Sequence, residues 1–317
     1  MGFYDIFNGD ADGLCALHQL RLAEPRESVL VTGVKRDVAL LARVAPAAGD
    51  ELTVLDISLD ANREALQRVL HAGARVRYFD HHFAGEVPRH PLLEAHLDFS
   101  ASTCTSLIVD GFLGGRHKAW AVAAAFGDNL GARAGEEAAA LGLGAAEVAA
   151  LRELGECLNY NAYGRDLADL HFHPADLYRS MRAFEDPLDF HARSAELGVL
   201  RHAVADDMRR ALALVAENVG NRALLVRMPD EAWSRRVAGT FANALARRHA
   251  DRIVALLVHA GDGYQVSLRA PEGGGGMHLI ARSFEGGNGR ERAAGIQFLP
   301  RADVPKLLAL LATPPPA

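Results

Sequence analysis

Cysteine and long apolar segments are scarce in this sequence. Three cysteines, Cys15, Cys104 and Cys157, are scattered among 317 residues without close spacing. This pattern argues against a disulfide framework and against a zinc knuckle, and it favours a reducing compartment. The N-terminal residues lack a basic region followed by an apolar stretch, and no apolar run is long enough to cross a bilayer. We therefore expect a cytoplasmic protein without membrane contacts.

Positive charge is also in short supply. The 34 lysines and arginines are outnumbered by 40 aspartates and glutamates, which gives a formal net charge of -6. Because binding through many phosphate contacts usually leaves a basic footprint, long duplex nucleic acid is not an expected partner. A small anionic ligand held locally is compatible with this charge. Half of the residues are hydrophobic, which is enough for one large core or, more naturally, for two domains with separate cores.

The first third of the chain alternates short apolar runs with amphipathic segments. The apolar runs predict buried strands at residues 4–7, 28–34, 52–55 and 76–79. Apolar residues at helical spacing predict helices at residues 13–23, 37–44 and 59–71. Repeated strand-helix-strand units of this kind predict an α/β domain with a mainly parallel sheet.

The rest of the chain predicts a helical connector and then a second, smaller α/β domain. Residues 135–200 are rich in alanine and leucine at helical spacing. Strand and helix patterns return at residues 223–227, 231–249, 253–259 and 264–269. We expect one domain over residues 1–200, including the connector, and another over residues 201–317. The proline-rich tail at residues 313–317 should be disordered.

Carboxylates follow three of the four predicted N-terminal strands. Asp10 and Asp12 come directly after the first strand, Asp56 ends the third, and Asp80-His81-His82 ends the fourth. Because ligands of such sheets bind at the carboxyl ends of the strands, these side chains should converge on one rim. Clustered like charges repel, so a divalent cation is the economical explanation. Mixed carboxylate and imidazole ligands favour manganese or iron over magnesium, calcium or zinc, and manganese is the predicted metal.

Each of these elements also has an ordinary structural interpretation. The sequence from Asp10 to Gly13 is common in turns and helix caps, and Asp56 could cap the following helix. A pair of histidines at a strand end is more often structural than metal-binding, and Asp128 could be a residue that ends a helix. Residues 159–163, Asn-Tyr-Asn-Ala-Tyr, could contact a base or form a turn between helices. Only the joint arrangement of four acidic elements favours a functional site.

Taken together, the acidic elements resemble the four ordered motifs of the DHH phosphoesterase superfamily. The matching residues are Asn8-Gly9-Asp10-Ala11-Asp12-Gly13, then Asp56, then Asp80-His81-His82, and finally Asp128. The C-terminal region is similar to the DHH-associated domain of RecJ-like exonucleases and nanoRNases. That similarity rests on Val-Ser-Leu-Arg, Gly-Gly-Asn-Gly and Ala-Ala-Gly at residues 266–269, 286–289 and 293–295.

The resemblance implies two divalent metal ions in a cleft between the two domains. Its metal ligands would be Asp10, Asp12, Asp56, His81 and Asp128, with Asp56 bridging the ions. Asp80 would support these ligands from behind, and His82 would face the phosphate. Substrate would be bound from the second domain by Arg269, Gly287, Gly289 and Arg290.

Two positions depart from the motifs of the superfamily. Asn8 stands where many relatives have a histidine, so one ion could be held more weakly or through water. Arg290 stands where the C-terminal signature usually has a histidine, and arginine is a good bidentate phosphate ligand.

The expected function is manganese-dependent hydrolysis of phosphodiesters in short oligonucleotides or small nucleotides, by metal-activated water. The alternatives are a catalytically weak nucleotide-binding regulatory protein and a pyrophosphatase or polyphosphatase. The exact substrate, the direction of cleavage and the existence of a homodimer stay open at this point.

Overall fold

The computed structural model describes residues 1–313 of the chain, so the predicted disorder of the last four residues lies outside the described part. Contacts within the chain separate it into two compact units, Met1–His202 and Ala203–Ala317. The change from one unit to the other falls inside helix α9, Ala195–Leu212. None of the helices in the described part combines the length and apolar character that a membrane span requires.

The first unit is built on a five-stranded sheet with the order β2-β1-β3-β4-β5. Every neighbouring pair in it is parallel, which confirms the predicted parallel α/β fold. Its strands are β1 Phe3–Phe7, β2 Val29–Val31, β3 Glu51–Leu55, β4 Arg75–Asp80 and β5 Leu93–Leu97. Strand β5 was not predicted, because its sequence mixes charged and apolar residues and it lies at the sheet edge.

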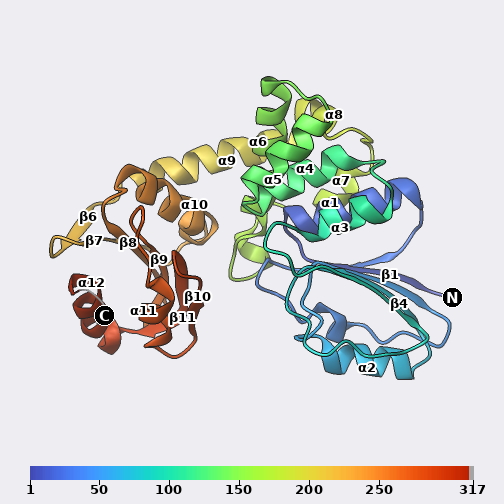
Figure 1. Cartoon of the computed structure of the whole chain (residues 1–317), viewed down its shortest axis with the longest axis horizontal. Coiled ribbons are helices and arrows are strands. Elements are labelled where there is room, and N and C mark those ends of the chain that lie inside the picture. The colour runs from blue at the N-terminus through green and yellow to red at the C-terminus, as the bar shows by residue number, and fades with distance from the viewer. Residues whose placement is uncertain (314–317) are drawn as a thin grey trace. The chain divides into compact units, whose positions relative to one another are not determined.

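Helices cover both faces of this sheet (Figure 1). One face carries α2, whose apolar side packs into a core with Ile6, Leu52, Val54 and Val76. The other face carries the remaining helices of the unit. Those on this second face are α1 Ala11–Ala23, α3 Thr105–Phe112, α4 Lys118–Gly127, α5 Gly131–Ala140, α6 Ala145–Ala162, α7 Pro174–Met181 and α8 Pro187–Arg193. Helix α2, on the first face, spans Arg63–His71.

The helix predicted at residues 37–44 is wrong in extent. Only one 3-10 turn forms there, at Leu40–Arg43. The segment is short, and Pro46 follows it closely, so the chain cannot continue as an α-helix beyond this point. Another short 3-10 turn lies at Leu167–Asp169.

The second unit contains a six-stranded sheet with the order β10-β11-β9-β8-β7-β6. Only the β7–β8 pair is parallel. The strands are β6 Ala216–Val219, β7 Ala223–Met228, β8 Ile253–Ala260, β9 Gly263–Arg269, β10 Gly287–Gly289 and β11 Ala293–Pro300. The helices are α10 Ala232–Arg248, α11 Met277–Arg282 and α12 Val304–Ala312, with a 3-10 turn at Arg301–Asp303.

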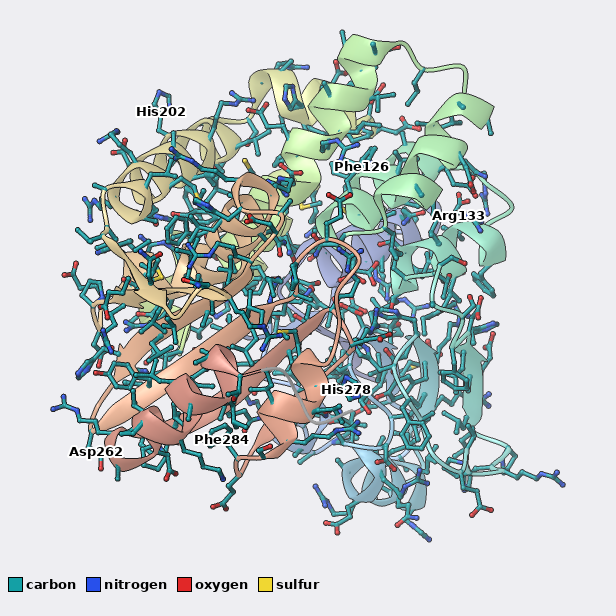
Figure 2. The ribbon with its side chains drawn as sticks, turned by 60° about the vertical axis from the view of Figure 1, so that its left-hand side comes forward. Phe126, Arg133, His202, Asp262, His278 and Phe284 are labelled. Carbon is teal, nitrogen blue, oxygen red and sulfur yellow. The ribbon has the colours of Figure 1, made fainter. Side chains whose placement is uncertain are left out.

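The core of this second unit is almost entirely apolar. Leu225, Leu257 and Ile296 of the sheet pack with Phe284, which lies just after α11 and is labelled in Figure 2. The glycine-rich loop at residues 273–276 precedes α11. A sheet of this kind provides a stable platform, and charged side chains of the unit lie mainly outside its core.

Candidate metal centre

The carboxylates predicted to share one rim do come together at the carboxyl ends of β1, β3 and β4. Asp10 follows β1, Asp56 follows β3, and Asp80 is the last residue of β4. Asp12 enters from the first turn of α1, and Asp128 from the residue that caps the end of α4. Because β1 and β3 are adjacent and β4 follows β3, their ends bring side chains from distant parts of the sequence to one place.

The start of α1 fixes Asp10. One of its carboxylate oxygens, Oδ1, accepts hydrogen bonds from the backbone N–H groups of Asp12 and Gly13, both at 3.1 Å. This is the usual arrangement of a helix N-cap. A Cβ atom at Gly13 would lie 2.1 Å from the carbonyl oxygen of Asn8, so only glycine allows the strand to turn this tightly into the helix.

His81 lies at the centre of three carboxylates. Its Nε2 is 3.5 Å from Asp56 Oδ1 and 3.9 Å from both Asp12 Oδ2 and Asp128 Oδ2. Two atoms that each lie about 2.1 Å from one ion are at most about 4.2 Å apart, so these distances suit ligands of a shared cation. Two groups of side chains here are spaced to hold a metal ion: Asp12, His81 and Asp128, and separately Asp56, His81 and His82. Both groups contain His81.

The N-terminus of α3 holds Asp12 in place, a contact that the sequence analysis missed. Asp12 Oδ2 accepts from the backbone N–H of Thr105, and Asp12 Oδ1 accepts from that of Ser106, both at 2.7 Å. The Thr105 hydroxyl donates to Asp56 Oδ1 at 3.1 Å. Free N–H groups at a helix start favour negative charge, so α3 orients two carboxylates of the centre.

Asp56 is the most constrained of these residues. Its φ of 59° places a non-glycine residue in the left-handed region, and its N–H donates to the Phe79 carbonyl at 3.0 Å. Such backbone conformations concentrate at functional sites. Burial first, and then the neighbouring carboxylates, raise the pKa of Asp56 well above its ordinary value. Burial likewise raises the pKa of Asp128. The ionised cluster therefore needs a compensating cation.

Asp80 and His82 form a pair beside this cluster. Asp80 is completely buried, and its Oδ1 lies 2.8 Å from His82 Nδ1, so the ring N–H donates to the carboxylate. Burial opposes a charged ring, but the hydrogen bond and the charge of Asp80 raise the pKa of His82. The side chain of His82 is 46% exposed. Its remaining ring nitrogen is thus directed away from Asp80 and is available to a bound ligand.

Lys35 is a further member of the site that the sequence analysis did not identify. Its amino group forms a short ion pair with Asp10 Oδ2 and lies 3.3 Å from both Asp128 Oδ1 and Asn159 Oδ1. Burial alone would raise the pKa of Asp10, but the charge and hydrogen bond of Lys35 keep it below its ordinary value. The sequence did carry a signal, because Lys35 directly follows the strand predicted at residues 28–34.

The segment at residues 159–163 is not a turn, because its first four residues lie in the last turn of α6. Asn159 accepts from Lys35 and donates to the Tyr163 hydroxyl at 3.2 Å. The side-chain amide of Asn8 is also hydrogen-bonded, since its Nδ2 donates to the Lys35 carbonyl at 3.1 Å. Both asparagines therefore help to place the lysine.

The predicted substrate-binding residues gather at one edge of the second sheet. Arg269 pairs with Ala293 across β9 and β11, and the N–H of Arg290 donates to the Ala293 carbonyl at 2.8 Å. Gly287 and Gly289 form the edge strand β10. A Cβ at Gly289 would lie 2.4 Å from Ala294 Cα, so close strand packing explains the glycine. The side chain of Arg290 is exposed.

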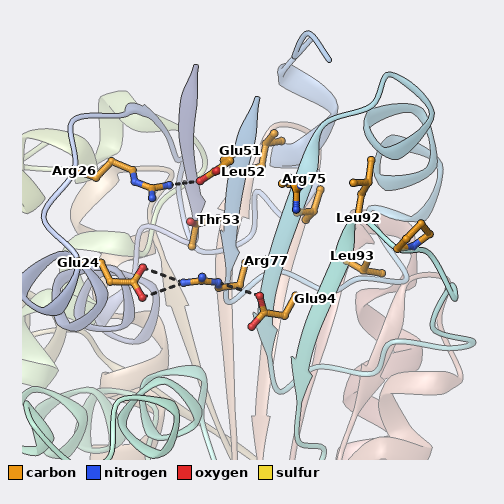
Figure 3. A pocket seen from close by; sticks show the side chains of 12 residues that line it. Glu24, Arg26, Glu51, Leu52, Thr53, Arg75, Arg77, Leu92, Leu93 and Glu94 are labelled. Carbon is orange, nitrogen blue, oxygen red and sulfur yellow. Dashed lines mark hydrogen bonds and ion pairs between the residues drawn. The ribbon is translucent and has the colours of Figure 1, made fainter. Parts of the chain in front are cut away.

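The amino ends of the first sheet carry a different charged feature. A cavity of about 270 Å³ lies there and is shown in Figure 3. Three arginines and three glutamates line it. Five of these six side chains are paired: Arg26 with Glu51 at 2.6 Å, and Arg77 with Glu24 at 3.0 Å and with Glu94 at 3.4 Å. Arg75 is the sixth. Because the two signs of charge are equal in number, this cavity lacks the excess of one sign found in the carboxyl-end cluster.

Comparisons with known proteins identify the fold. No family model matches the chain, and no curated protein matches it by sequence. A crystal structure of exonuclease RecJ bound to manganese superposes with a TM-score of 0.61 at 16% identity, covering 99% of this chain and 90% of RecJ. A pGpG-specific phosphodiesterase from Vibrio cholerae gives 0.54 at 10% identity, over 98% and 97% of the two chains.

An exopolyphosphatase-related protein from Bacteroides fragilis is also similar, with a TM-score of 0.50 at 13% identity, over 98% of this chain and 91% of that one. At such low identity these likenesses establish the fold, and the activity has to be argued from the site itself. Over nearly its whole length, the chain has a RecJ-like fold.

Proposed function

We propose that this protein is a metal-dependent phosphoesterase that hydrolyses phosphodiester bonds in short oligonucleotides or small nucleotides. The observation that carries the proposal is the position of His81 Nε2 within 4 Å of three carboxylates at the carboxyl ends of the parallel strands. Ligand sites in open α/β sheets lie at this edge. The fold adds support, because it is shared with an exonuclease and with a phosphodiesterase.

The residues proposed to hold the metal are Asp12, Asp56, His81 and Asp128. A divalent ion bound there would supply hydroxide at neutral pH and neutralise charge on the phosphoryl oxygens. A mixed set of three carboxylates and one imidazole suits manganese. The similar RecJ structure contains manganese, which supports the same choice here. The two-ion arrangement that the DHH resemblance implies, with Asp10 as a further ligand, stays a prediction.

Asp80 and His82 are proposed to act on the substrate phosphate. Asp80 is buried and holds the Nδ1–H of His82, so it fixes both the tautomer and the orientation of the ring. The exposed side of His82 then presents the other nitrogen to a phosphate oxygen. When the ring is protonated, this nitrogen donates a charge-assisted hydrogen bond.

The substrate is proposed to be a short nucleotide. The net charge of -6 gives little long-range attraction for a polyanion. Arg269 and Arg290 of the second unit are the proposed phosphate-binding groups of that unit. Arginine binds phosphate in a bidentate manner, so a few well-placed residues suffice for a small substrate.

The other candidate functions are less well supported. A regulatory protein without catalysis would have no need of a strained, buried aspartate among other carboxylates. A polyphosphatase finds some support in the likeness to an exopolyphosphatase-related protein. Among the described residues, however, one lysine, Lys35, forms ion pairs with the carboxylates of the centre, whereas a chain of phosphates would need several basic groups at the metal.

The test is turnover by purified full-length protein with Mn²⁺. The substrates are RNA and DNA of two to five nucleotides, linear and cyclic dinucleotides, adenosine bisphosphate, pyrophosphate and polyphosphate. We expect cleavage of short nucleotides that stops with a chelator and resumes when Mn²⁺ is restored. Turnover of pyrophosphate or polyphosphate alone would support the polyphosphatase, and nucleotide binding without any turnover would support the regulatory protein.

A further inference from the structure

We propose that the ammonium group of Lys35 takes the place of one of the two metal ions, so that this protein binds a single divalent ion. This inference rests on the proposed function and refines it. The ion would be held by Asp12, Asp56, His81 and Asp128. Lys35 would provide the second positive charge on the side of Asp10.

The position of the lysine is the first argument. Its amino group is in ion-pair contact with Asp10 and Asp128, and it also donates to Asn159. A cation coordinated by Asp10 and Asp128 would have to occupy the same space. With 28% of its side chain exposed, Lys35 still borders the open part of the site.

The lysine is also held by its own backbone. The N–H of Lys35 donates to the Ala162 carbonyl at 2.9 Å, and its carbonyl accepts from Asn8 Nδ2 at 3.1 Å. The first of these bonds ties the segment after β2 to the end of α6. The second ties it to the segment after β1. These two bonds fix the backbone from which the side chain reaches Asp10.

The ligands left on the Asp10 side are the second argument. Asp10 Oδ1 already accepts from two N–H groups at the start of α1, and Oδ2 is paired with Lys35. The amide nitrogen of Asn8 has no lone pair to offer a metal, and its Oδ1 is 3.3 Å from the N–H of Asp10.

Among the described residues, the two groups of side chains spaced to hold an ion both contain His81, and neither contains Asp10. The two halves of the site are therefore unequal. One half has two groups of potential ligands that share the His81 imidazole, and the other has one carboxylate already paired with an amine.

Electrostatics points the same way. Four carboxylates surround the site: Asp10, Asp12, Asp56 and Asp128. One divalent ion together with the Lys35 ammonium balances three of these charges, and His82 lies beside them. A second divalent ion next to the ammonium would be repelled by both cations at short range. Lys35 thus supplies one of the two positive charges of that ion, at the Asp10 carboxylate, without requiring a metal.

The experiment is calorimetric titration of the full-length protein with MnCl₂, combined with electron paramagnetic resonance of the bound Mn²⁺. For the wild type we expect one ion per chain and the spectrum of an isolated ion. The double variant Asn8→His/Lys35→Met restores a ligand and removes the amine, so it should bind two ions with a spin-coupled spectrum. Lys118→Met is the matched control.

Lys118 suits this purpose because its side chain is 25% exposed and pairs with Asp110 and Glu137, away from the strand ends. This control variant should bind one ion. Two ions in the wild type would overturn the inference, and so would a folded double variant that still binds one. If the double variant fails to fold, the stoichiometry and spectrum of the wild type still decide.

The proposed function is judged separately, by turnover. A wild type with two ions and nucleotide turnover would refute only the role of Lys35. A wild type with one ion and no turnover of any substrate would leave Lys35 supported and refute the phosphoesterase. A wild type that binds no ion would refute both proposals.

Discussion

The two ends of the N-terminal sheet carry charged side chains in opposite arrangements. At the carboxyl ends, Asp10, Asp12 and Asp56 are buried together and share one sign of charge. At the amino ends, three arginines and three glutamates line the cavity, and all of them except Arg75 are joined in the ion pairs that Figure 3 shows. The same sheet thus has one end with uncompensated charge and one end whose charges are already balanced.

This difference in charge balance distinguishes a candidate ligand-binding site from a cavity without one. Partly exposed ion pairs contribute little to stability, and they leave no strong field for a ligand. Buried carboxylates without enough counter-charge cost free energy in the protein alone, and they recover it when a cation binds. At this sheet, the cluster of carboxylates that needs a cation is therefore stronger evidence of a functional site than the presence of a cavity.

The sharpest test compares the two ends of a single strand. Asp56 follows β3, and Glu51 begins it. We expect Asp56→Asn to lower kcat by about 10³-fold or more, because a catalytic metal supplies several kcal/mol and about 1.4 kcal/mol equals a factor of ten. Glu51→Gln should stay within about twofold of the wild type, because a partly exposed ion pair contributes little. Steady-state kinetics with Mn²⁺ measures both, and equal effects would show that the two ends do not differ as proposed.

The next largest effect is expected at Lys35. Replacing it with methionine keeps an unbranched side chain that is one atom shorter, and removes the charge beside Asp10. Loss of one preorganised electrostatic contact typically lowers kcat by about 10²-fold or more. Lys118→Met should leave kcat unchanged. If the Lys35→Met variant kept full activity at every Mn²⁺ concentration, Lys35 would have no role in the site.

Asp80 should have a smaller effect, because it acts through His82. Asp80→Asn weakens the hold on the ring, and loss of such an orienting carboxylate typically costs about 10- to 100-fold in activity or metal affinity. The number of bound ions should not change, because Asp80 is not among the proposed ligands. Kinetics and Mn²⁺ titration of the same sample check both statements. A lost ion would make Asp80 a determinant of the metal centre itself.

Local patterns in the sequence were enough to predict the parallel sheet and to place Asp10, Asp56 and Asp80 at one rim. Strand alternation and strand ends can be recognised within a few residues. The contacts of Asp12 with the start of α3 could not be predicted in this way, because they join residues 93 and 94 positions apart. Lys35 could have been found by the rule used for the aspartates, since it also follows a strand. A pattern of metal ligands does not include it, because a protonated lysine has no lone pair with which to coordinate a metal.

The smallest effect is expected at the amino ends, and it completes the comparison. Arg77→Met removes the partner of both Glu24 and Glu94. Since the side chain of Arg77 is one-third exposed, the free energy of unfolding should fall by about 1 kcal/mol or less, and less still at high salt. Urea unfolding at low and high salt measures this change, while kcat should match the wild type. A large loss of turnover with intact stability would instead make the paired cavity part of the catalytic machinery, and charge balance would then fail as the feature that distinguishes the two ends of the sheet.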